Sequence, residues 1–249
     1  MPHVTRGKQR KKARANGTLA VSTLNTALRA LRRVLRLAVE WGVIASAPKI
    51  KLLQGEQHRD RVLTQEEETK YFAVAEEPLV SIATLLADSG IRPDECYRLR
   101  WEDVRFDDAQ YTHGSISILT GKTKAAKRKL PVTLRERNVL EMLWQNAKKP
   151  EIGWVFPSAT KSGHADHATV RKQHRNTLKL SGVRPFVLYS FRHTFLTRLG
   201  ASGCDVWTLA RIAGHSSIQM SAKYVHPDED AVLTAMARLP QPEVPPQRQ

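Results

Sequence analysis

Three segments that are far apart in the sequence carry side chains suited to chemistry on a phosphodiester. They are Arg92 in the run GIRPDECYRLRW, the lysines of GKTKAAKRK, and the run from Tyr189 to Tyr224, which contains Arg192. A guanidinium presents a rigid fork that pairs with two phosphate oxygens, and two guanidiniums can neutralise the charge that develops as phosphorus becomes five-coordinate. Because a lone arginine is more often a surface cation, this prediction requires a fold that brings Arg92 and Arg192 together.

The charge of the chain points to the same kind of partner. The 249 residues hold 40 Lys and Arg against 24 Asp and Glu, a formal net charge of +16, and 13 basic against 3 acidic residues fall within residues 1–60. This excess favours a polyanion, nucleic acid before an anionic membrane surface. No apolar run approaches the roughly 18 residues of a membrane span, and the basic start lacks the apolar block of a secretory signal, so we expect a cytoplasmic protein.

Cysteine usage argues against a metal centre. Cys96 and Cys204 are far apart and outside any C-x-x-C pattern, so the sequence predicts neither a zinc site nor a disulfide framework. Both cysteines have apolar neighbours and are expected to be small core residues.

Residues 1–60 are expected to form a basic arm, a partial helical region and a linker. Leucines recur at spacings of four and three between Ser22 and Trp41, which predicts an amphipathic helix whose stripe is used for packing. Gly42 is placed to end this helix, and the polar stretch from Pro48 to Arg61 is typical of an interdomain linker. Four arginines lie mostly off the stripe and are candidates for DNA binding, namely Arg29, Arg32, Arg33 and Arg36.

Residues 61–240 are expected to form one domain that is mainly α with a small β-sheet, an α+β fold. Thr64 and Glu67 have capping-box spacing, and an apolar helix from Pro78 to Asp88 runs into Gly90 and places Arg92 at a helix junction. The β-rich stretches 115–119 and 130–132 predict a β-hairpin with a lysine-rich tip, although such a tip could also be only a solvated turn. Further helices are expected at 133–147, 189–201, 205–213, 217–224 and 228–239, and the proline-rich tail 241–249 is expected to be disordered.

Taken in order, these runs resemble the sequence boxes of the tyrosine recombinase (phage integrase) family over nearly the whole chain. GIRPDECYRLRW is similar to the first arginine box, which implies that Arg92 is catalytic and that Glu95 supports the site. YSFRHTFLTRL resembles the second box and implies a catalytic Arg192. AGHSSIQMSAKYVHP resembles the third box, in which His215 precedes the nucleophile, Tyr224, by nine residues.

The resemblance implies a site-specific recombinase that cleaves and rejoins duplex DNA without metal, ATP or other cofactor. Tyr224 would attack phosphorus, form a 3′-phosphotyrosyl bond and release a 5′-hydroxyl, while His215 would hydrogen-bond a non-bridging oxygen. A hairpin lysine would protonate the leaving oxygen; matching to the family favours Lys122, with Lys124 as the alternative. The family also implies a homotetramer on two synapsed DNA sites, accessory DNA-bending proteins and association with the nucleoid.

Two features depart from the family pattern. Tyr189 stands where the family has a histidine, three residues before Arg192, and its phenol is a poor base at neutral pH, so we expect Tyr189 to contribute a hydrogen bond to the site. His193, the residue after Arg192, is not expected to take over the role of that histidine, because adjacent residues on a helix point about 100° apart, and it is expected to be a packing or capping residue. Only about sixty residues precede Thr64, so the N-terminal region is interpreted either as a short variant of the family's core-binding domain or as lacking its true beginning.

Three other functions remain open from the sequence. A non-catalytic DNA-binding remnant of an integrase is favoured by Tyr189 and by the short N-terminal region. A type IB topoisomerase would share the tyrosyl chemistry but relax supercoils at any sequence. A basic RNA-associated protein would form no covalent adduct with DNA.

Overall fold

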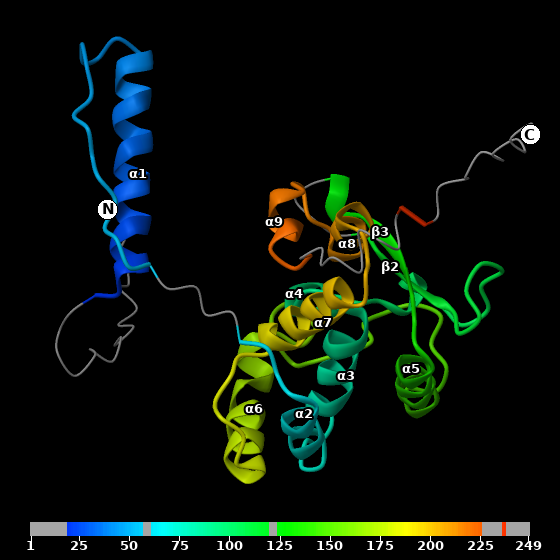
Figure 1. Cartoon of the computed structure of the whole chain (residues 1–249). Helices are drawn as coiled ribbons and strands as arrows, with labels where there is room; N and C mark the ends of the chain where they lie inside the picture. Colours follow the sequence, from blue (N-terminus) through cyan, green and yellow to red (C-terminus); the bar gives the residue numbers. More distant parts are fainter. Residues whose placement is uncertain (1–18, 57–60, 120–123, 226–235, 238–249) are drawn as a thin grey trace, which may run out of the picture. The chain divides into compact units, whose positions relative to one another are not determined.

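The computed structural model describes residues 19–56, 61–119, 124–225 and 236–237. The chain divides into two compact units, Met1–Arg59 and Asp60–Gln249 (Figure 1). Among the residues so described, none of the helices has the length and apolar character to cross a bilayer.

The first unit is a long helix followed by an extended segment that returns along it (Figure 1). Helix α1 spans Val21–Glu40 and is followed by Gly42 with a left-handed φ of +70°, so the predicted helix is present with a shift of one residue. The Asn25 side chain ties the returning segment to the helix: its amide donates to the Leu53 carbonyl at 2.9 Å, and its oxygen accepts from the Leu53 N–H at 2.8 Å. The leucine stripe does not form a closed core, because Leu31 is exposed.

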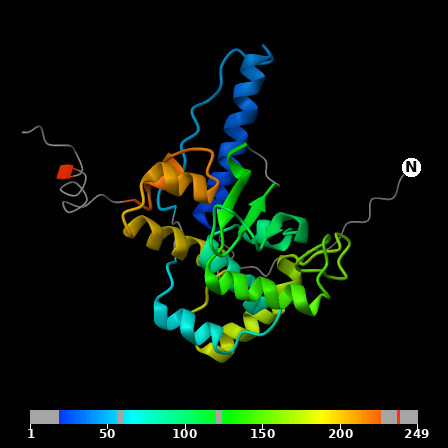
Figure 2. The same cartoon turned by 90° about the vertical axis from the view of Figure 1, so that its right-hand side faces the viewer.

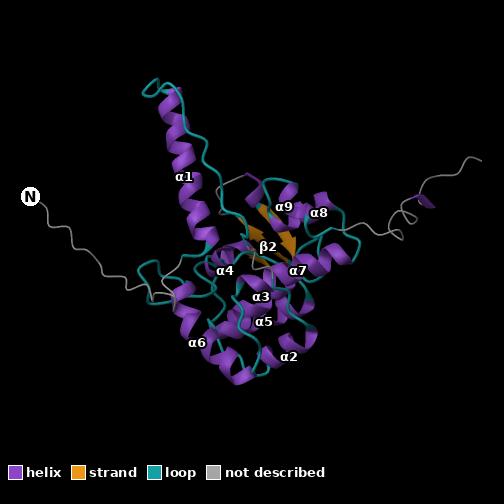
Figure 3. Cartoon of the chain, turned by 60° about the vertical axis from the view of Figure 1, so that its left-hand side comes forward, coloured by secondary structure: helices purple, strands orange, loops and turns teal. Residues whose placement is uncertain are grey.

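The second unit is a helical body with one small sheet (Figure 3). Its helices are α2 Gln65–Phe72, α3 Leu79–Ser89, α4 Pro93–Tyr97, α5 Leu134–Asn146, α6 His167–Ser181, α7 Tyr189–Ala201, α8 Val206–Ala213 and α9 Gln219–Ala222, with the short 3-10 turns η1 Trp101–Asp103 and η2 Lys124–Ala126. The expected α+β class is confirmed. At one end lie the sheet, α8 and α9, and at the other end lie α2 and α6 (Figures 1 and 2).

Local signals fix the start of this unit. The Thr64 hydroxyl accepts a hydrogen bond from the Glu67 N–H at 3.2 Å, and the Glu67 carboxylate accepts from the Thr64 N–H at 3.1 Å, so the predicted capping box opens α2. Helix α3 is buried on most of its surface and ends at Gly90, whose φ is +63°. A β-carbon at Gly90 would lie 2.3 Å from the Phe195 ring, so glycine also lets α7 approach the end of α3.

The predicted hairpin is confirmed as strands β2 Ser115–Ile118 and β3 Arg128–Pro131, which pair antiparallel. Sequence reasoning missed β1, Val104–Arg105, which adds to β2 and makes the sheet order β1-β2-β3. A two-residue strand gives no alternating pattern to recognise. The helix expected at 217–224 is shorter than expected, and of the helix expected at 228–239 only residues 236–237 lie within the described chain, where they are helical.

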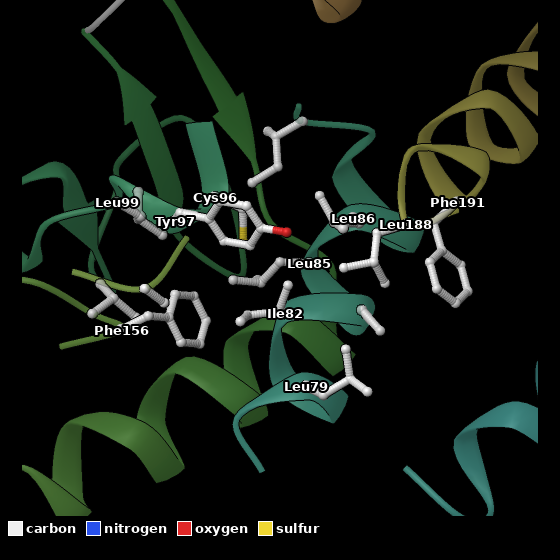
Figure 4. Close-up of a cluster of buried hydrophobic side chains, with 14 of the residues drawn as sticks. Leu79, Ile82, Leu85, Leu86, Cys96, Tyr97, Leu99, Phe156, Leu188 and Phe191 are labelled. Carbon is white, nitrogen blue, oxygen red and sulfur yellow. The ribbon is translucent and has the colours of Figure 1, made fainter. Parts of the chain in front are cut away.

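The core gathers around α3, as Figure 4 shows. Ile82 and Leu85 of α3 pack with Cys96, Leu99 and Phe191 in one apolar cluster, which confirms Cys96 as a core residue. A second, smaller cluster joins α7 to α8, and its buried members are Leu196, Leu209, Ala213 and Tyr224. The predicted nucleophile therefore lies at the edge of a packed apolar layer.

Candidate active site

Arg92 lies at the junction between α3 and α4, where it is the N-cap residue of α4. Its Nη1 donates to the Glu95 carboxylate at 2.7 Å and its Nη2 donates to the Gly214 carbonyl at 2.9 Å. The same carboxylate accepts the Arg92 backbone N–H at 2.9 Å. Because the side chain keeps about 29% of its surface exposed, this guanidinium is held at both ends yet still accessible.

Glu95 is shared between two guanidiniums, and the second belongs to Arg128 on β3. Arg128 is almost fully buried, and its two terminal nitrogens donate to the Glu95 oxygens at 2.9 and 3.2 Å. It also donates from Nε to the Ile212 carbonyl at 2.7 Å. Burial disfavours the Glu95 carboxylate, but hydrogen bonds from Arg128 and Arg92 outweigh it and hold the pKa of Glu95 below its ordinary value.

Arg192 is fully buried on α7 and is held by the ends of two helices. Its Nη1 donates to the Gly90 carbonyl at 2.6 Å, after α3, and its Nη2 donates to the Ala213 carbonyl at 2.7 Å, at the end of α8. Burial lowers the pKa of Arg192 to about 10, so the side chain is still protonated at neutral pH. Its Nε is buried and has no hydrogen-bond partner in the described part of the chain.

His215 follows α8 and contacts Arg192 directly. The Nη2 of Arg192 donates to His215 Nε2 at 3.1 Å, so the proton of the neutral ring belongs on Nδ1, which lies 2.7 Å from the Ser221 hydroxyl. Burial and then the positive charges of Arg192 and Arg92 lower the pKa of His215 to about 4. His215 is therefore neutral at pH 7, and its Nε2 faces a guanidinium in this structure.

Tyr224 lies just after α9 with its side chain buried. Its hydroxyl is 3.0 Å from Nδ1 of His193, whose ring meets the phenol edge-on, while the His215 ring stacks on the phenol with centroids 6.4 Å apart. Burial raises the pKa of Tyr224, and the nearby Lys223 ammonium opposes that rise. A β-carbon at Gly200 would lie 1.9 Å from the Tyr224 carbonyl oxygen, so this glycine lets α7 approach the predicted nucleophile closely.

The structure thus brings Arg92, Glu95, Arg192, His215 and Tyr224 together around the ends of α3 and α8. Tyr189 begins α7 and is about half exposed, with its ring centroid 6.0 Å from Cζ of Arg192. Lys122 lies outside the described residues, and Lys124 is placed in η2 by its backbone alone.

The four arginines of α1 differ in their surroundings. Arg29 pairs with Glu56 at 2.7 Å and Arg32 donates to the Ile50 carbonyl at 2.8 Å, so both hold the returning segment. Arg33 and Arg36 are exposed. The DNA-binding role predicted for all four stays a prediction.

The sequence did not reveal the contacts of two residues near the site. Arg128 was one of several basic residues in a lysine-rich hairpin, and its alternation with the neighbouring Lys129 was the one available signal that it faces inward. His193 was expected to pack or cap, and it does pack against Tyr224, but its Nδ1 also reaches the Tyr224 hydroxyl. Among the residues the structure describes, no group of three or more His, Cys, Asp or Glu side chains could hold a metal ion.

Residues 61–230 match the family model described as phage integrase family. The chain belongs to the phage integrase family. It is 29% identical over 220 residues to the integrase of Salmonella phage P22, covering 83% of this chain and 54% of that protein. It is 25% identical over 228 residues to the tyrosine recombinase XerD of Lacticaseibacillus casei, covering 85% of this chain and 74% of that protein.

The fold agrees with family membership. A solved structure of the Tn1549 transposon integrase in complex with circular intermediate DNA superposes on this integrase-family chain with a TM-score of 0.70 and 21% identity, covering 88% of this chain and 80% of that one. The chain spans between half and three-fifths of the length of the first three curated relatives that it matches.

Proposed function

We propose that this chain is a site-specific DNA recombinase that cleaves and rejoins duplex DNA through a phosphotyrosyl bond at Tyr224. The observation that carries the proposal is the convergence of Arg92, Arg192, His215 and Tyr224 from four separate segments. Membership of the phage integrase family and the likeness to DNA-bound integrase structures support it. Four protomers on two DNA sites, with accessory DNA-bending proteins and action at the nucleoid, are part of the same proposal.

The scissile phosphate would lie against the two guanidiniums. Arg92 is the more exposed of the two and would contact the phosphate first. The Nε of Arg192, which finds no partner among the described residues, is a buried donor that a phosphate oxygen would satisfy. A buried donor without a partner in a native protein calls for such an explanation. Donors aimed at oxygens that gain charge in the transition state are the largest single contribution in reactions of this kind.

The Tyr224 oxygen would then attack phosphorus in line with the departing 5′-oxygen. The new bond is a 3′-phosphotyrosine, and the leaving oxygen takes a proton from a lysine of the hairpin, Lys122 or else Lys124. Because the phosphotyrosine conserves the phosphodiester energy, a 5′-hydroxyl from the same or another duplex can reverse the step. His215 would donate from Nε2 to a non-bridging oxygen, which requires the scissile phosphate to replace Arg192 at Nε2 and the ring to carry its proton on Nε2 instead of Nδ1.

Covalent capture tests the proposal with a pool of DNA sequences instead of one chosen site. A library of duplexes with a randomised centre and staggered nicks is incubated with the protein, and adducts that survive denaturation are recovered and sequenced. We expect the wild-type chain to enrich a common sequence joined to the peptide that contains Tyr224, and Tyr224→Phe to give none. The matched control Tyr111→Phe removes a phenol beside Lys129 and should leave capture unchanged.

The other outcomes are equally informative. An adduct that persists in Tyr224→Phe would refute the choice of nucleophile. Wild-type protein that binds duplexes but captures none would favour the non-catalytic remnant. Relaxation of any supercoiled plasmid, without a preferred sequence, would favour a topoisomerase.

A further inference from the structure

His193 is a buried titratable residue for which the reaction as described has no use. It follows Arg192 on α7, is about 8% exposed, and places Nδ1 3.0 Å from the Tyr224 hydroxyl. The two rings meet edge-on with centroids 5.2 Å apart and planes 62° apart. With Nδ1 at hydrogen-bonding distance from the hydroxyl, the imidazole contacts the polar end of Tyr224 and does not lie flat over the phenol face.

The other groups that the structure describes around Tyr224 are poorly placed to take its proton. Both nitrogens of His215 are engaged, one by Arg192 and one by Ser221, and its ring stacks nearly parallel to the phenol at 18°. Lys223 places an ammonium 4.9 Å from the centre of the Tyr224 ring, and an ammonium has no lone pair to accept a proton. Tyr189 is itself a phenol, with its ring beside Arg192.

We propose that His193 is a further catalytic residue, whose Nδ1 accepts the Tyr224 proton as the phenol oxygen attacks phosphorus. This inference rests on the proposed function. In the forward step the Tyr224 O–H bond breaks, its proton passes to Nδ1 and its electron pair forms the bond to phosphorus. The bond from phosphorus to the 5′-oxygen breaks, and that oxygen takes its proton from the hairpin lysine. In the reverse step the His193 imidazolium returns the proton to the departing tyrosyl oxygen.

The surroundings of the pair favour transfer over a static contact. Burial holds Tyr224 in its protonated form, so the phenol needs an acceptor at the moment of attack. Among the described residues, the charged and titratable groups that face the pair are Lys223 on the segment of Tyr224, Arg192 and Tyr189 on α7, and the stacked His215. The Lys223 and Arg192 cations both stabilise a developing phenolate.

The test compares two variants on duplexes captured by the wild-type chain. His193→Asn keeps an acceptor near Nδ1 but cannot take a proton, and His193→Phe keeps the ring but removes both nitrogens. Single-turnover cleavage should fall in both by about 10²- to 10⁴-fold, the usual contribution of a general base. The wild-type rate should also fall as the pH is lowered and the His193 imidazole takes up a proton, and this dependence should vanish in His193→Asn. A loss smaller than tenfold in His193→Asn, or an unchanged pH profile, would overturn the proposal.

The chain contains its own matched control for the loss of a histidine–tyrosine pair. His174 Nδ1 lies 2.7 Å from the Tyr71 hydroxyl within the core, and its Nε2 contacts the Phe186 carbonyl at 2.9 Å. His174→Asn should lower the melting temperature but leave the cleavage rate per folded molecule unchanged. If His174→Asn slows cleavage as much as His193→Asn does, the effect of His193 is structural and the proposal fails.

A substrate with sulfur in place of the 5′-bridging oxygen distinguishes a general base that acts on Tyr224 from a general acid that acts on the leaving group. The leaving thiolate needs no proton, so this substrate should restore cleavage to variants of the hairpin lysine but not to His193→Asn. Rescue of His193→Asn would place His193 on the leaving-group side and refute its role toward Tyr224. Absence of any adduct with the wild-type chain would instead refute the proposed function, so the two failures are distinguishable.

Discussion

Replacement of Arg128 by methionine tests the buried ion pair behind the site. The change keeps a long side chain and removes the guanidinium that donates to both Glu95 oxygens and to the Ile212 carbonyl. Removing one partner of a buried pair costs about 3–5 kcal/mol, because the remaining charge is left uncompensated. Since Glu95 keeps its hydrogen bond from Arg92 at 2.7 Å, we expect the lower end, about 3 kcal/mol.

The expected loss is large enough to measure by thermal and urea unfolding. In a domain of this size each kcal/mol lowers the melting temperature by about 2–4 °C, so Arg128→Met should melt roughly 6–12 °C below wild type. Arg137→Met is the matched control: Arg137 pairs with Glu141 and donates to the Phe106 carbonyl, but that pair is partly exposed. It should cost less than about 1 kcal/mol. Equal losses of stability in the two variants would refute the claim that the buried pair of Arg128 and Glu95 stabilises the fold more than the partly exposed pair does.

The pH dependence of unfolding gives an independent check on the same pair. The folded pKa of Glu95 is below its unfolded value, so its contribution to stability is present above the unfolded pKa and is lost as pH falls through the folded one. Without Arg128 the folded pKa of Glu95 should rise, and the loss of stability at acid pH that is due to Glu95 should become smaller. The difference in unfolding free energy between the two proteins should therefore narrow as the pH falls below about 4. A constant difference down to low pH would show that the methionine acts through packing alone.

Three further predictions follow from other parts of the molecule. Burial raises the pKa of Glu136 to about 8, so the folded state keeps this proton at a pH where the unfolded state has lost it. The free energy of unfolding should therefore fall as the pH rises from about 4.5 to 8, by up to roughly 1.4 kcal/mol per pH unit. Glu136→Gln should reduce this dependence in urea unfolding at pH 5 and pH 8, and an unchanged dependence would contradict the prediction. Gly200→Ala should abolish adduct formation while retaining DNA binding, because its β-carbon would meet the Tyr224 carbonyl oxygen; the exposed neighbour Ala201→Ser should remain active. Arg36→Ala should lower the slope of log affinity for DNA against log salt by about one unit. Arg29 already pairs with Glu56, so Arg29→Ala should change the slope less. Equal effects of the two variants in anisotropy titrations would argue against this distinction.

Features that depend on neighbouring residues could be predicted from the sequence. The capping box at Thr64 and the glycine after α3 are decided within a few residues, so local pattern alone places Arg92 at a helix junction. The family boxes supplied Arg192, His215 and Tyr224 because their spacing is itself a local pattern. Resemblance, not physical derivation, assigned the roles of these residues.

Features that depend on tertiary contacts could not be predicted in this way. Glu95 and Arg128 are 33 residues apart and meet only because β3 passes beside α4. Helical spacing showed that His193 and Arg192 point in different directions, but it carried no information about what each of them faces. The structure places Tyr224 opposite His193 and places carbonyls at the ends of α3 and α8 opposite Arg192. The periodicity of a sequence shows which residues share one face of a helix, but only the three-dimensional structure shows which residues that face contacts.

The charges at the site fit a transition state better than a ground state. In the described part of the site the guanidiniums of Arg92, Arg128 and Arg192 bring three positive charges, and the Glu95 carboxylate, bonded to Arg92 and Arg128, offsets one of them. The Lys223 ammonium beside the Tyr224 ring adds to this positive charge. The guanidinium excess of two is held by the carbonyls of Gly90, Ala213 and Gly214, at the negative ends of the dipoles of α3 and α8. A phosphodiester carries one negative charge, whereas the five-coordinate species formed by attack of a tyrosyl oxygen carries nearly two. A fixed excess of positive charge therefore stabilises the five-coordinate species more than it stabilises the phosphodiester. That difference in stabilisation lowers the barrier and accelerates the reaction.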